Sequence, residues 1–477
     1  MTFDDHHDPA RRRVLGLGAA ALGIAASTAV GLPRAASAAS GAGKTLVCLY
    51  LYGGMDCHDT LIPMDRSEHD ALRAQRPGIL AAHDAAGTSR DIANLTELAI
   101  SSTTGGRRFG LPNNLARPAD EHGIARMFER GEAAWLGSIG PLVEPVSRSA
   151  FSQRSVRLPS RLFSHNDQQA SWTTFGAEGS TQGWGGQFVR EAGAAGSPFA
   201  TVNIGGVLAY LQADPVSPFV LGRGSTGSGR GIDRFMAGKF AGREKTDTEL
   251  REILDRHLRH GSHVPDNLFA RDLSALHARG VADSGTYDAA VAASVATSVS
   301  FPDTRVGEGL ELAARTIAAS GRLGTANQIL MVGVGGFDTH ADQGARLGAL
   351  QGQIGEAVAA FRAAMVEAGR WNDVTLFTAA DFGRTLNQNG SGTDHGWGGH
   401  HVVMGGSVRG GDLYGGLPDY DVRSEAFTDD RGRLIPTASV DQYAYTLGRW
   451  FGLSDGKLGA VLPNIANFAE RDLGFMG

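Results

Sequence analysis

The chain has 477 residues, a formal net charge of −6 at neutral pH and two cysteines. A mildly acidic chain without a basic run is not expected to bind nucleic acid, and the length suits one large α/β domain or two smaller ones. Cys48 and Cys57 fall on an expected strand and on the loop after it, too far apart for a disulfide. The fold is therefore not expected to depend on oxidation.

The first residues have the pattern of a bacterial export signal. Arg11 to Arg13 precede an apolar stretch rich in alanine and glycine, Val14 to Leu32, as in signals read by the twin-arginine translocase. Ala36 to Ala38 matches a small-residue cleavage site. A permanent membrane anchor is the alternative, but the stretch contains little Leu or Ile. We expect residues 1–38 to be removed, leaving 39–477 as a single domain, periplasmic or secreted, without a stable membrane span.

The first predicted strand of this domain is Lys44 to Tyr52, which is rich in β-branched and aromatic residues. It ends at two glycines that are followed by Asp56 and Asp59. Acidic residues at this place are either turn formers or metal ligands, and the loop by itself leaves both interpretations open.

A helix from Ile124 to Glu132 and a buried strand from Ala133 to Ile139 come next. Ser164, His165 and Asp167 then follow one another closely. Neighbours in sequence rarely form a catalytic triad, because adjacent side chains point apart. Ser164 is therefore interpreted as a lone nucleophile, or with His165 as a substrate-binding pair. The alternative is that Ser164 only caps a helix.

The middle of the chain is expected to hold two short strands and a helical insertion. The strands are Phe199 to Gly206 and Phe219 to Gly222, and the glycine- and serine-rich run from Gly222 to Gly231 is typical of a flexible loop. Apolar residues at helical spacing from Thr248 to Ser320 predict helices. We interpret residues of about 240–320 as an insertion over the sheet.

Two later strands end in the same way as the first. Asn327 to Val334 runs into a loop with Asp338 and His340, a helix from Leu347 to Ala368 follows, and Val374 to Ala380 is the next strand. Strand, helix and strand in this order indicate a parallel sheet, and polar residues after such strands meet at one edge. The predicted fold is an α/β three-layer sandwich with a mainly parallel central sheet. The loop after the last of these strands contains Asp381, Arg384, Asn387, Asp394, His395, His400 and His401.

These loops supply more aspartate and histidine than one metal ion needs. Mixed carboxylate and imidazole ligands suit Zn, Mn or Fe, and a catalytic ion needs only three protein ligands. We therefore expect one or two divalent transition-metal ions, and a bridged pair would serve hydrolysis. Arg384 and Asn387 are expected to position an anionic substrate. The candidate ligands are Asp56, Asp338, His340, Asp381, Asp394, His395, and either His400 or His401.

The chain closes with an expected helix from Val440 to Leu453. Tyr443, Leu447 and Trp450 form an apolar stripe along one face of this helix. We interpret the stripe as core.

Seven motifs along the chain carry a resemblance to a known family. They are GGMDCHDTLIP, FSHNDQQ, GWGG, GGFDTHADQ, DFGRT, GTDHG and VDQYAYTLGRWFGL. In this order, and over nearly the whole mature chain, they resemble the bacterial exported proteins of domain-of-unknown-function family 1501. That family is grouped with the alkaline phosphatase and sulfatase superfamily.

The resemblance implies an alkaline-phosphatase-like sandwich with two metals at its strand ends. It implies a ligand role for Asp56 on the first strand and a nucleophilic role for Ser164 at the start of a helix. The superfamily's usual Asp-His pair is Asp381-Phe382 here, so the histidine is expected from His395. The other ligands that the resemblance implies are Asp338, His340, Asp381 and Asp394.

The expected function is an exported metal-dependent hydrolase of phosphate or sulfate esters, with a small molecule or a polymer as substrate. The first alternative is a non-catalytic, metal-stabilised binding protein of the cell envelope. The second is a redox or oxygen enzyme that holds Fe with the same residues. Apart from substrate, the expected partner is the twin-arginine translocase during export.

Overall fold

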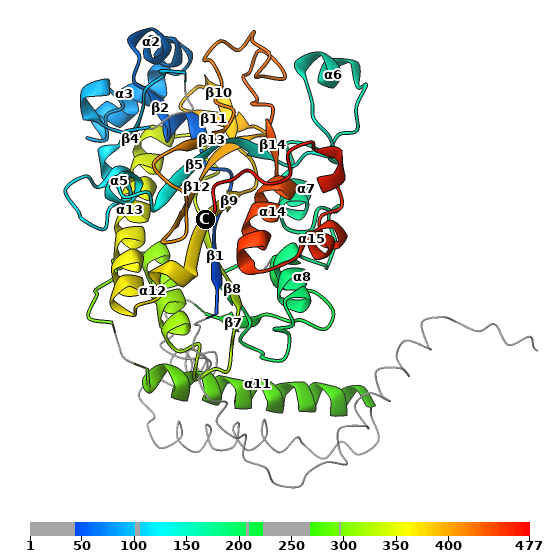
Figure 1. Cartoon of the computed structure of the whole chain (residues 1–477). Coiled ribbons are helices and arrows are strands. Elements are labelled where there is room, and N and C mark those ends of the chain that lie inside the picture. The colour runs from blue at the N-terminus through cyan, green and yellow to red at the C-terminus, as the bar shows by residue number, and fades with distance from the viewer. Residues whose placement is uncertain (1–42, 101–104, 207–208, 223–267, 295–296) are drawn as a thin grey trace, which may run out of the picture. The chain divides into compact units, whose positions relative to one another are not determined.

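A nine-stranded sheet forms the centre of the protein, as a computed structural model shows (Figure 1). The structure describes residues 43–100, 105–206, 209–222, 268–294 and 297–477. The strand order is β13-β5-β12-β9-β1-β8-β6-β7, and β14 pairs with β5. The strands are β1 (Thr45–Tyr52), β5 (Ala133–Gly140), β6 (Thr201–Ile204), β7 (Phe219–Leu221), β8 (Gln328–Gly335), β9 (Val374–Ala380), β12 (Gly399–Gly405), β13 (Leu413–Gly415) and β14 (Ala438–Ser439).

The sheet is parallel except at β12, which runs antiparallel to both β9 and β5. The prediction of a mainly parallel sheet in a mixed α/β protein is thus confirmed. In the register, Tyr52 at the end of β1 pairs with Gly335 of β8, and Leu51 pairs with Ala380 of β9. The carboxyl ends of these three strands are therefore level. Because β12 runs the other way, its first residue lies at the same edge.

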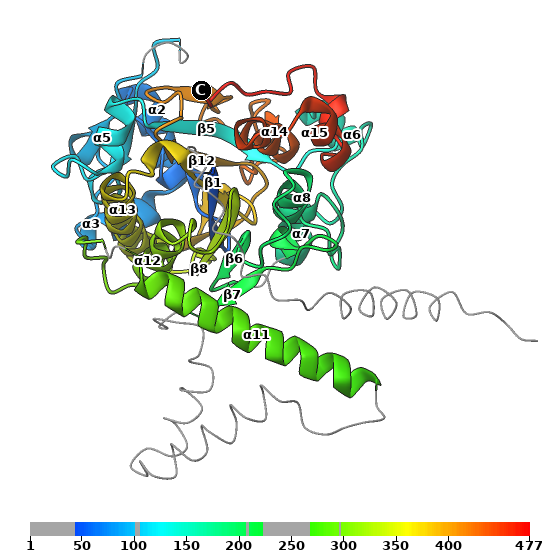
Figure 2. The ribbon, with the colours of Figure 1, turned by 60° about the horizontal axis from the view of Figure 1, so that its bottom comes forward.

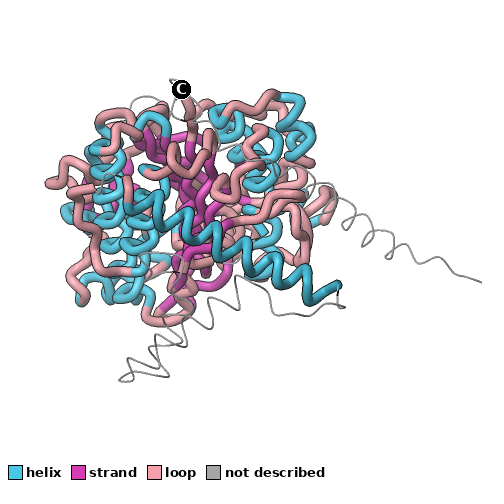
Figure 3. The backbone as a smooth tube through the Cα atoms, turned by 90° about the horizontal axis from the view of Figure 1, so that it is seen from below, coloured by secondary structure: helices cyan, strands magenta, loops and turns pink. Residues whose placement is uncertain are grey.

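Helices cover both faces of the sheet (Figures 2 and 3). On one side α12 packs on β6 and β8, and α13 packs on α12; on the other side α8 contacts β6 and β8, and α14 contacts β1 and β5. The helices of the described residues are α2 (Arg66–Gln75), α3 (Pro77–Ala85), α4 (Asn113–Ala116), α5 (Ile124–Glu129), α6 (Arg148–Gln153), α7 (His165–Thr174), α8 (Trp184–Glu191), α11 (Leu268–Ala292), α12 (Arg305–Ala318), α13 (Gln343–Glu367), α14 (Val440–Phe451) and α15 (Asp455–Val461).

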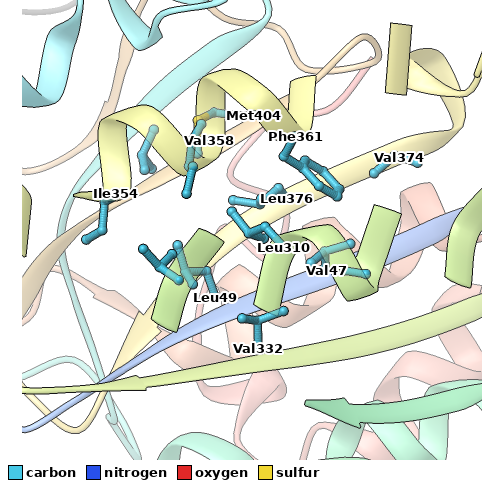
Figure 4. Close-up of a cluster of buried hydrophobic side chains, with 14 of the residues drawn as sticks. Val47, Leu49, Leu310, Val332, Ile354, Val358, Phe361, Val374, Leu376 and Met404 are labelled. Carbon is cyan, nitrogen blue, oxygen red and sulfur yellow. The ribbon is translucent and has the colours of Figure 1, made fainter. Parts of the chain in front are cut away.

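The alternation of side chains along β1 separates the two hydrophobic cores. Val47 and Leu49 face the core that includes Leu310 of α12 and Val358 of α13 (Figure 4). Leu46, Cys48 and Tyr50 face the core under α8 and α14. Since each fully buried aliphatic side chain contributes about 1.5–3 kcal/mol, the two cores hold the strand firmly in register. The apolar stripe of α14 lies in the second core, as expected; its members are Tyr443, Leu447 and Trp450.

Two smaller sheets lie beyond the carboxyl edge. β10 (Arg384–Asn389) and β11 (Gly392–His395) form an antiparallel pair. β2 (Ile62–Pro63), β4 (Phe109–Pro112) and β3 (Leu95–Glu97) form a three-stranded sheet.

The expected helical insertion, at residues of about 240–320, is only partly covered by the described residues. Residues 223–267, with the glycine- and serine-rich run, lie outside the described residues. The described residues belong to one compact unit. α12 lies in the main helix layer, because Leu310, Ala313 and Ile317 are buried in the core against β6 and β8. α11 joins this layer through Tyr287, whose hydroxyl lies 2.8 Å from Thr316 Oγ1.

Both cysteines are free and buried, as expected. Among the described residues, no helix is both long and apolar enough to cross a membrane.

Candidate metal centre

Three loops meet at the carboxyl edge of the sheet. Gly53, directly after β1, has φ +107°, and a Cβ there would lie 2.2 Å from the backbone nitrogen of Asp338. Only glycine permits this conformation and this close approach. The Gly53 N–H also donates to Asp381 Oδ2 at 3.0 Å. The loops after β1, β8 and β9 are therefore in direct contact, as the strand pattern predicted.

Asp338 is the centre of a cluster of three histidines. Its Oδ1 lies 3.0 Å from His340 Nε2 and 3.4 Å from His395 Nε2. Its Oδ2 lies 3.6 Å from His165 Nε2. The Nε2 atoms of His340 and His395 are only 2.9 Å apart. Asp338 and His340 are almost half exposed, so the cluster is open to solvent.

In two of the three histidines, Nδ1 forms a hydrogen bond that fixes the orientation of the ring. His165 Nδ1 lies 2.6 Å from Asp381 Oδ2, and this hydrogen bond raises the pKa of His165 against the effect of burial. His395 Nδ1 lies 2.8 Å from the carbonyl oxygen of Phe163, which can only accept, so Nδ1 carries the proton. Burial is the main cause that lowers the pKa of His395. Nε2 of both rings therefore faces Asp338. Metal-ligating histidines commonly have their other ring nitrogen bonded to a carboxylate or a carbonyl in this way.

The backbone before α7 is strained where it forms the cluster. Arg161 has φ +46° and Phe163 has φ +73°, left-handed conformations that cost about 1–3 kcal/mol each. The strain places the carbonyl of Phe163 on His395 and starts α7 at His165. Strain of this kind gathers at functional sites. No sequence signal could have found it, because neither residue is glycine.

The residues present fit one divalent transition-metal ion. His165, Asp338 and His395 can offer ligand atoms that all lie within 4.8 Å of one another. His340 Nε2 approaches two of these three residues closely enough to be a fourth ligand. Three imidazoles and one carboxylate suit Zn, Mn or Fe. This is the one such group among the described residues, and so it supports a single ion.

In the chain, Ser164 lies between Phe163, whose carbonyl contacts His395, and His165, a member of the cluster. It occupies the N-cap position of α7, but its hydroxyl makes no capping bond to the backbone. The hydroxyl instead donates to Oδ2 of the buried Asp167 at 2.8 Å. The Ser164 hydroxyl therefore has an acceptor for its proton in the Asp167 carboxylate.

Asp56 is not placed with the histidine cluster. Its Oδ2 accepts from Arg76 Nη1 at 2.8 Å and from Gln343 Nε2 at 2.7 Å, and its Oδ1 accepts from the backbone N–H of His58 at 3.0 Å. Both side chains of the Asp56–Arg76 pair are completely buried. Asp59 is held in the same manner by His83 and Arg90. The structure therefore assigns Asp56 to a structural ion pair and not to the metal ligands.

Asp381 and Arg384 also differ from their expected roles. Asp381 is fully buried and orients His165, so it acts behind a ligand. The buried Arg384 guanidinium donates to Asp338 Oδ1 at 2.8 Å and to the Gly53 carbonyl at 3.1 Å. Arg384 thus positions the carboxylate of Asp338. All three of its nitrogens already donate hydrogen bonds within the protein, so it is not placed to bind a substrate. Asn387 donates to the backbone of Asp430.

His400 and His401 do not join the cluster, because β12 begins before them at Gly399. His400 Nδ1 accepts from the backbone N–H of Ser138 at 3.0 Å, and His401 Nδ1 lies 3.2 Å from Thr378 Oγ1. Burial lowers the pKa of His400 to about 4 and that of His401 to about 3. Both are neutral core histidines.

Asp394 lies at the rim of the histidine cluster. Its Oδ1 is 3.7 Å from His340 Nδ1 and accepts from Asn389. It can orient His340 by charge, and it is not among the closest ligand candidates.

The fold and the cluster define an α/β protein with a candidate one-metal site of histidines and a carboxylate at the carboxyl edge of its sheet. The model of the family described as "Protein of unknown function (DUF1501)" matches residues 43–465, and the chain belongs to that family. A search of curated proteins found no match.

Proposed function

We propose that this protein is an exported, metal-dependent hydrolase of phosphate or sulfate esters with an alkaline-phosphatase-like fold. The observation that carries the proposal is the convergence of three imidazole nitrogens on Asp338, next to a helix that begins with a serine. Two of these imidazoles are fixed by acceptors at Nδ1. Such fixation preserves a ligand geometry and is not needed on a surface that only solvates charge.

Some of the site residues are proposed metal ligands, and others orient those ligands. His165, His340, His395 and Asp338 are the proposed ligands. When bound, a divalent ion at this position polarises an ester oxygen and neutralises the charge that develops in the reaction. Asp381 holds His165 and Arg384 holds Asp338, in each case through the bonds described above.

Ser164 is the proposed nucleophile. Its Oγ attacks the phosphorus or sulfur atom and forms an ester bond, while the bond to the leaving oxygen breaks and an aryl ester releases its aryl oxide. The hydroxyl proton passes to Asp167 Oδ2, which already accepts that hydrogen bond at 2.8 Å. In the second step the oxygen of a water molecule bonds to the phosphorus or sulfur atom while the bond to Ser164 Oγ breaks. Asp167 returns its proton to Oγ, phosphate or sulfate leaves, and the second proton of the water is lost to solvent. The amino end of the ten-residue helix α7 favours the anionic group during both steps.

Turnover of an aryl phosphate and an aryl sulfate by chelated and reconstituted protein tests this proposal. We expect activity to depend on added Zn, Mn or Fe, and Ser164→Ala to lower kcat by several orders of magnitude with the metal content unchanged. Ser155→Ala, at an exposed serine nine positions earlier, is the matched control and should keep full activity.

Each other outcome points to a different function. A loss of only a few-fold in Ser164→Ala means that water attacks directly. Protein that holds metal but turns over neither ester with any of the three ions contradicts the hydrolase and favours the envelope binding protein. Activity that requires both Fe and oxygen favours the redox enzyme.

Export through the twin-arginine route is proposed from the sequence, since residues 1–42 lie outside the described residues. Replacing Arg11, Arg12 and Arg13 together by Lys should leave the precursor in the cytoplasm, because the translocase reads the arginine pair. Cell fractionation with an antibody to the mature domain measures this, and Arg154→Lys is the control. Normal periplasmic accumulation of the triple variant would falsify this route.

A further inference from the structure

A second candidate site lies at the far end of α7. A cavity of about 260 Å³ opens between the carboxyl end of α7, the first turn of α14 and the loop after β5. Taking about 30 Å³ for each water molecule, it has room for roughly nine. Its lining is mostly apolar and includes the buried side chains of Asp441 and Ser171. The apolar wall residues are Pro141, Leu142, Val143, Leu158, Pro159, Phe175 and Ala177.

Asp441 is a buried carboxylate without a cationic partner among the described residues. Its Oδ1 accepts from the backbone N–H of Asn464 at 2.9 Å, and its Oδ2 has only a long contact of 3.4 Å to Asn464 Nδ2. Two other buried aspartates, Asp56 and Asp59, are by contrast paired with arginines. A buried charge is costly unless an opposite charge or several hydrogen bonds compensate it. Oδ2 of Asp441 therefore lacks a strong partner.

Burial has a measurable consequence for this carboxyl group. It raises the pKa of Asp441 to about 6, against the smaller effect of the hydrogen bonds from Asn464. At pH 7.5 the group is nevertheless ionised, and folding then carries the cost of burying it. A neutral asparagine of the same shape would avoid this cost. The protein thus retains a buried anion without a cationic partner among the described residues, and a locally unfavourable charge of this kind is a property expected of binding sites.

The cavity is distinct from the candidate metal centre. α7 has ten residues, with His165 at the metal end and the cavity residue Phe175 as its C-cap. At 1.5 Å per residue the two ends are about 15 Å apart. A ligand in the cavity therefore does not touch the ion, and the following proposal does not depend on the hydrolase.

We propose that this cavity binds a primary ammonium group on a short aliphatic stem, with Asp441 as its counter-ion. The ammonium supplies the opposite charge and the donors that Asp441 Oδ2 lacks. The stem contacts the apolar wall, for example Leu142 and Leu158. An anionic ligand is excluded by the carboxylate, and a neutral alcohol would leave its charge uncompensated.

The probe is n-pentylammonium, titrated by calorimetry into the full-length protein at pH 7.5, with n-pentanol as the uncharged comparison. We expect saturable binding of the amine and at least about tenfold weaker binding of the alcohol, since loss of a buried charge pair costs that or more. No binding of the amine, or equal binding of the two probes, overturns the proposal.

Two variants locate the site. Asp441→Asn should weaken amine binding at least about tenfold and should melt no lower than wild type at pH 7.5, because it removes a buried charge. Ala177→Phe, at an exposed position of the cavity rim, should block entry without a change in the core. Asp419→Asn, at an exposed aspartate, controls for net charge and should bind as wild type does. Wild-type affinity in either Asp441→Asn or Ala177→Phe contradicts the assignment.

Discussion

Replacing Asp338 with alanine should remove the transition metal from the protein and lower ester hydrolysis by roughly three orders of magnitude. Asp338 approaches all three histidines of the cluster, through Oδ1 to His340 and His395 and through Oδ2 to His165. Without its charge, the imidazoles lose the anion that favours a divalent ion between them. Elemental analysis of purified protein measures the first effect, and turnover of an aryl phosphate measures the second.

The variant should stay folded, which separates metal loss from unfolding. Asp338 is almost half exposed, so its removal leaves no large cavity, although Arg384 loses one acceptor. Added metal should stabilise wild type by about 2.7 kcal/mol at a hundredfold excess over Kd and should not stabilise the variant. Asp419→Ala, at an exposed aspartate, is the matched control. Wild-type metal content in Asp338→Ala would contradict the proposed site.

A substitution at Asp381 should have a smaller effect on metal affinity than Asp338→Ala. Asp381→Asn keeps the shape of the side chain but removes the charge that faces His165 Nδ1 at 2.6 Å. Because Asp381 orients a ligand and is not one itself, we expect metal affinity to fall by about 10- to 100-fold and not to vanish. A complete loss of metal, equal to that in Asp338→Ala, would instead mean that Asp381 binds the ion directly.

Replacing Asp56 with alanine should lower the free energy of unfolding by about 3–5 kcal/mol and leave the metal content of the folded protein unchanged. The Arg76 guanidinium and the Asp56 carboxylate are completely buried and 2.8 Å apart. The variant leaves Arg76 buried without its anion and deprives Gln343 of an acceptor. Breaking a buried pair by removing one partner has this large cost because the remaining charge is uncompensated.

Denaturant unfolding with a double-mutant cycle measures this effect. Asp56→Ala, Arg76→Ala and the double variant should show a coupling energy well above that of an exposed pair such as Arg108–Glu97. Loss of metal from Asp56→Ala with little change in stability would restore Asp56 as a ligand and contradict the structural assignment.

The position of the site could be predicted from the sequence because it depends on strand direction. Buried apolar runs ending in glycine, aspartate and histidine predicted β1, β8 and β9, and parallel strands place such endings at one edge. The structure confirms these strands within a residue or so at each end. Asp338, His340 and His395 lie together at this edge.

The role of each polar residue could not be predicted in the same way. Asp56 and Asp338 follow their strands in almost the same local pattern. Asp56 becomes half of an ion pair because Arg76, between α2 and α3, and Gln343, at the start of α13, both reach it. Asp338 stays accessible to the histidines. The role of Asp56 therefore depends on residues 20 and 287 positions away in the sequence.

The histidines show the same limit. His400 was expected in a polar loop, but strand β12 begins at Gly399 and carries His400 and His401 into the core. His165 was expected to bind substrate together with Ser164, but its Nε2 lies 3.6 Å from Asp338 Oδ2, among the candidate metal ligands.

The three strands that carry the site, their direction and the edge at which chemistry is possible could be derived from the sequence, since these depend on local periodicity and on glycine at turns. Which carboxylates are paired inside the protein, and which histidines keep a free nitrogen, depends on tertiary packing. Hydrogen bonds and ion pairs join whichever groups the packing brings within about 3 Å, whatever their separation along the chain.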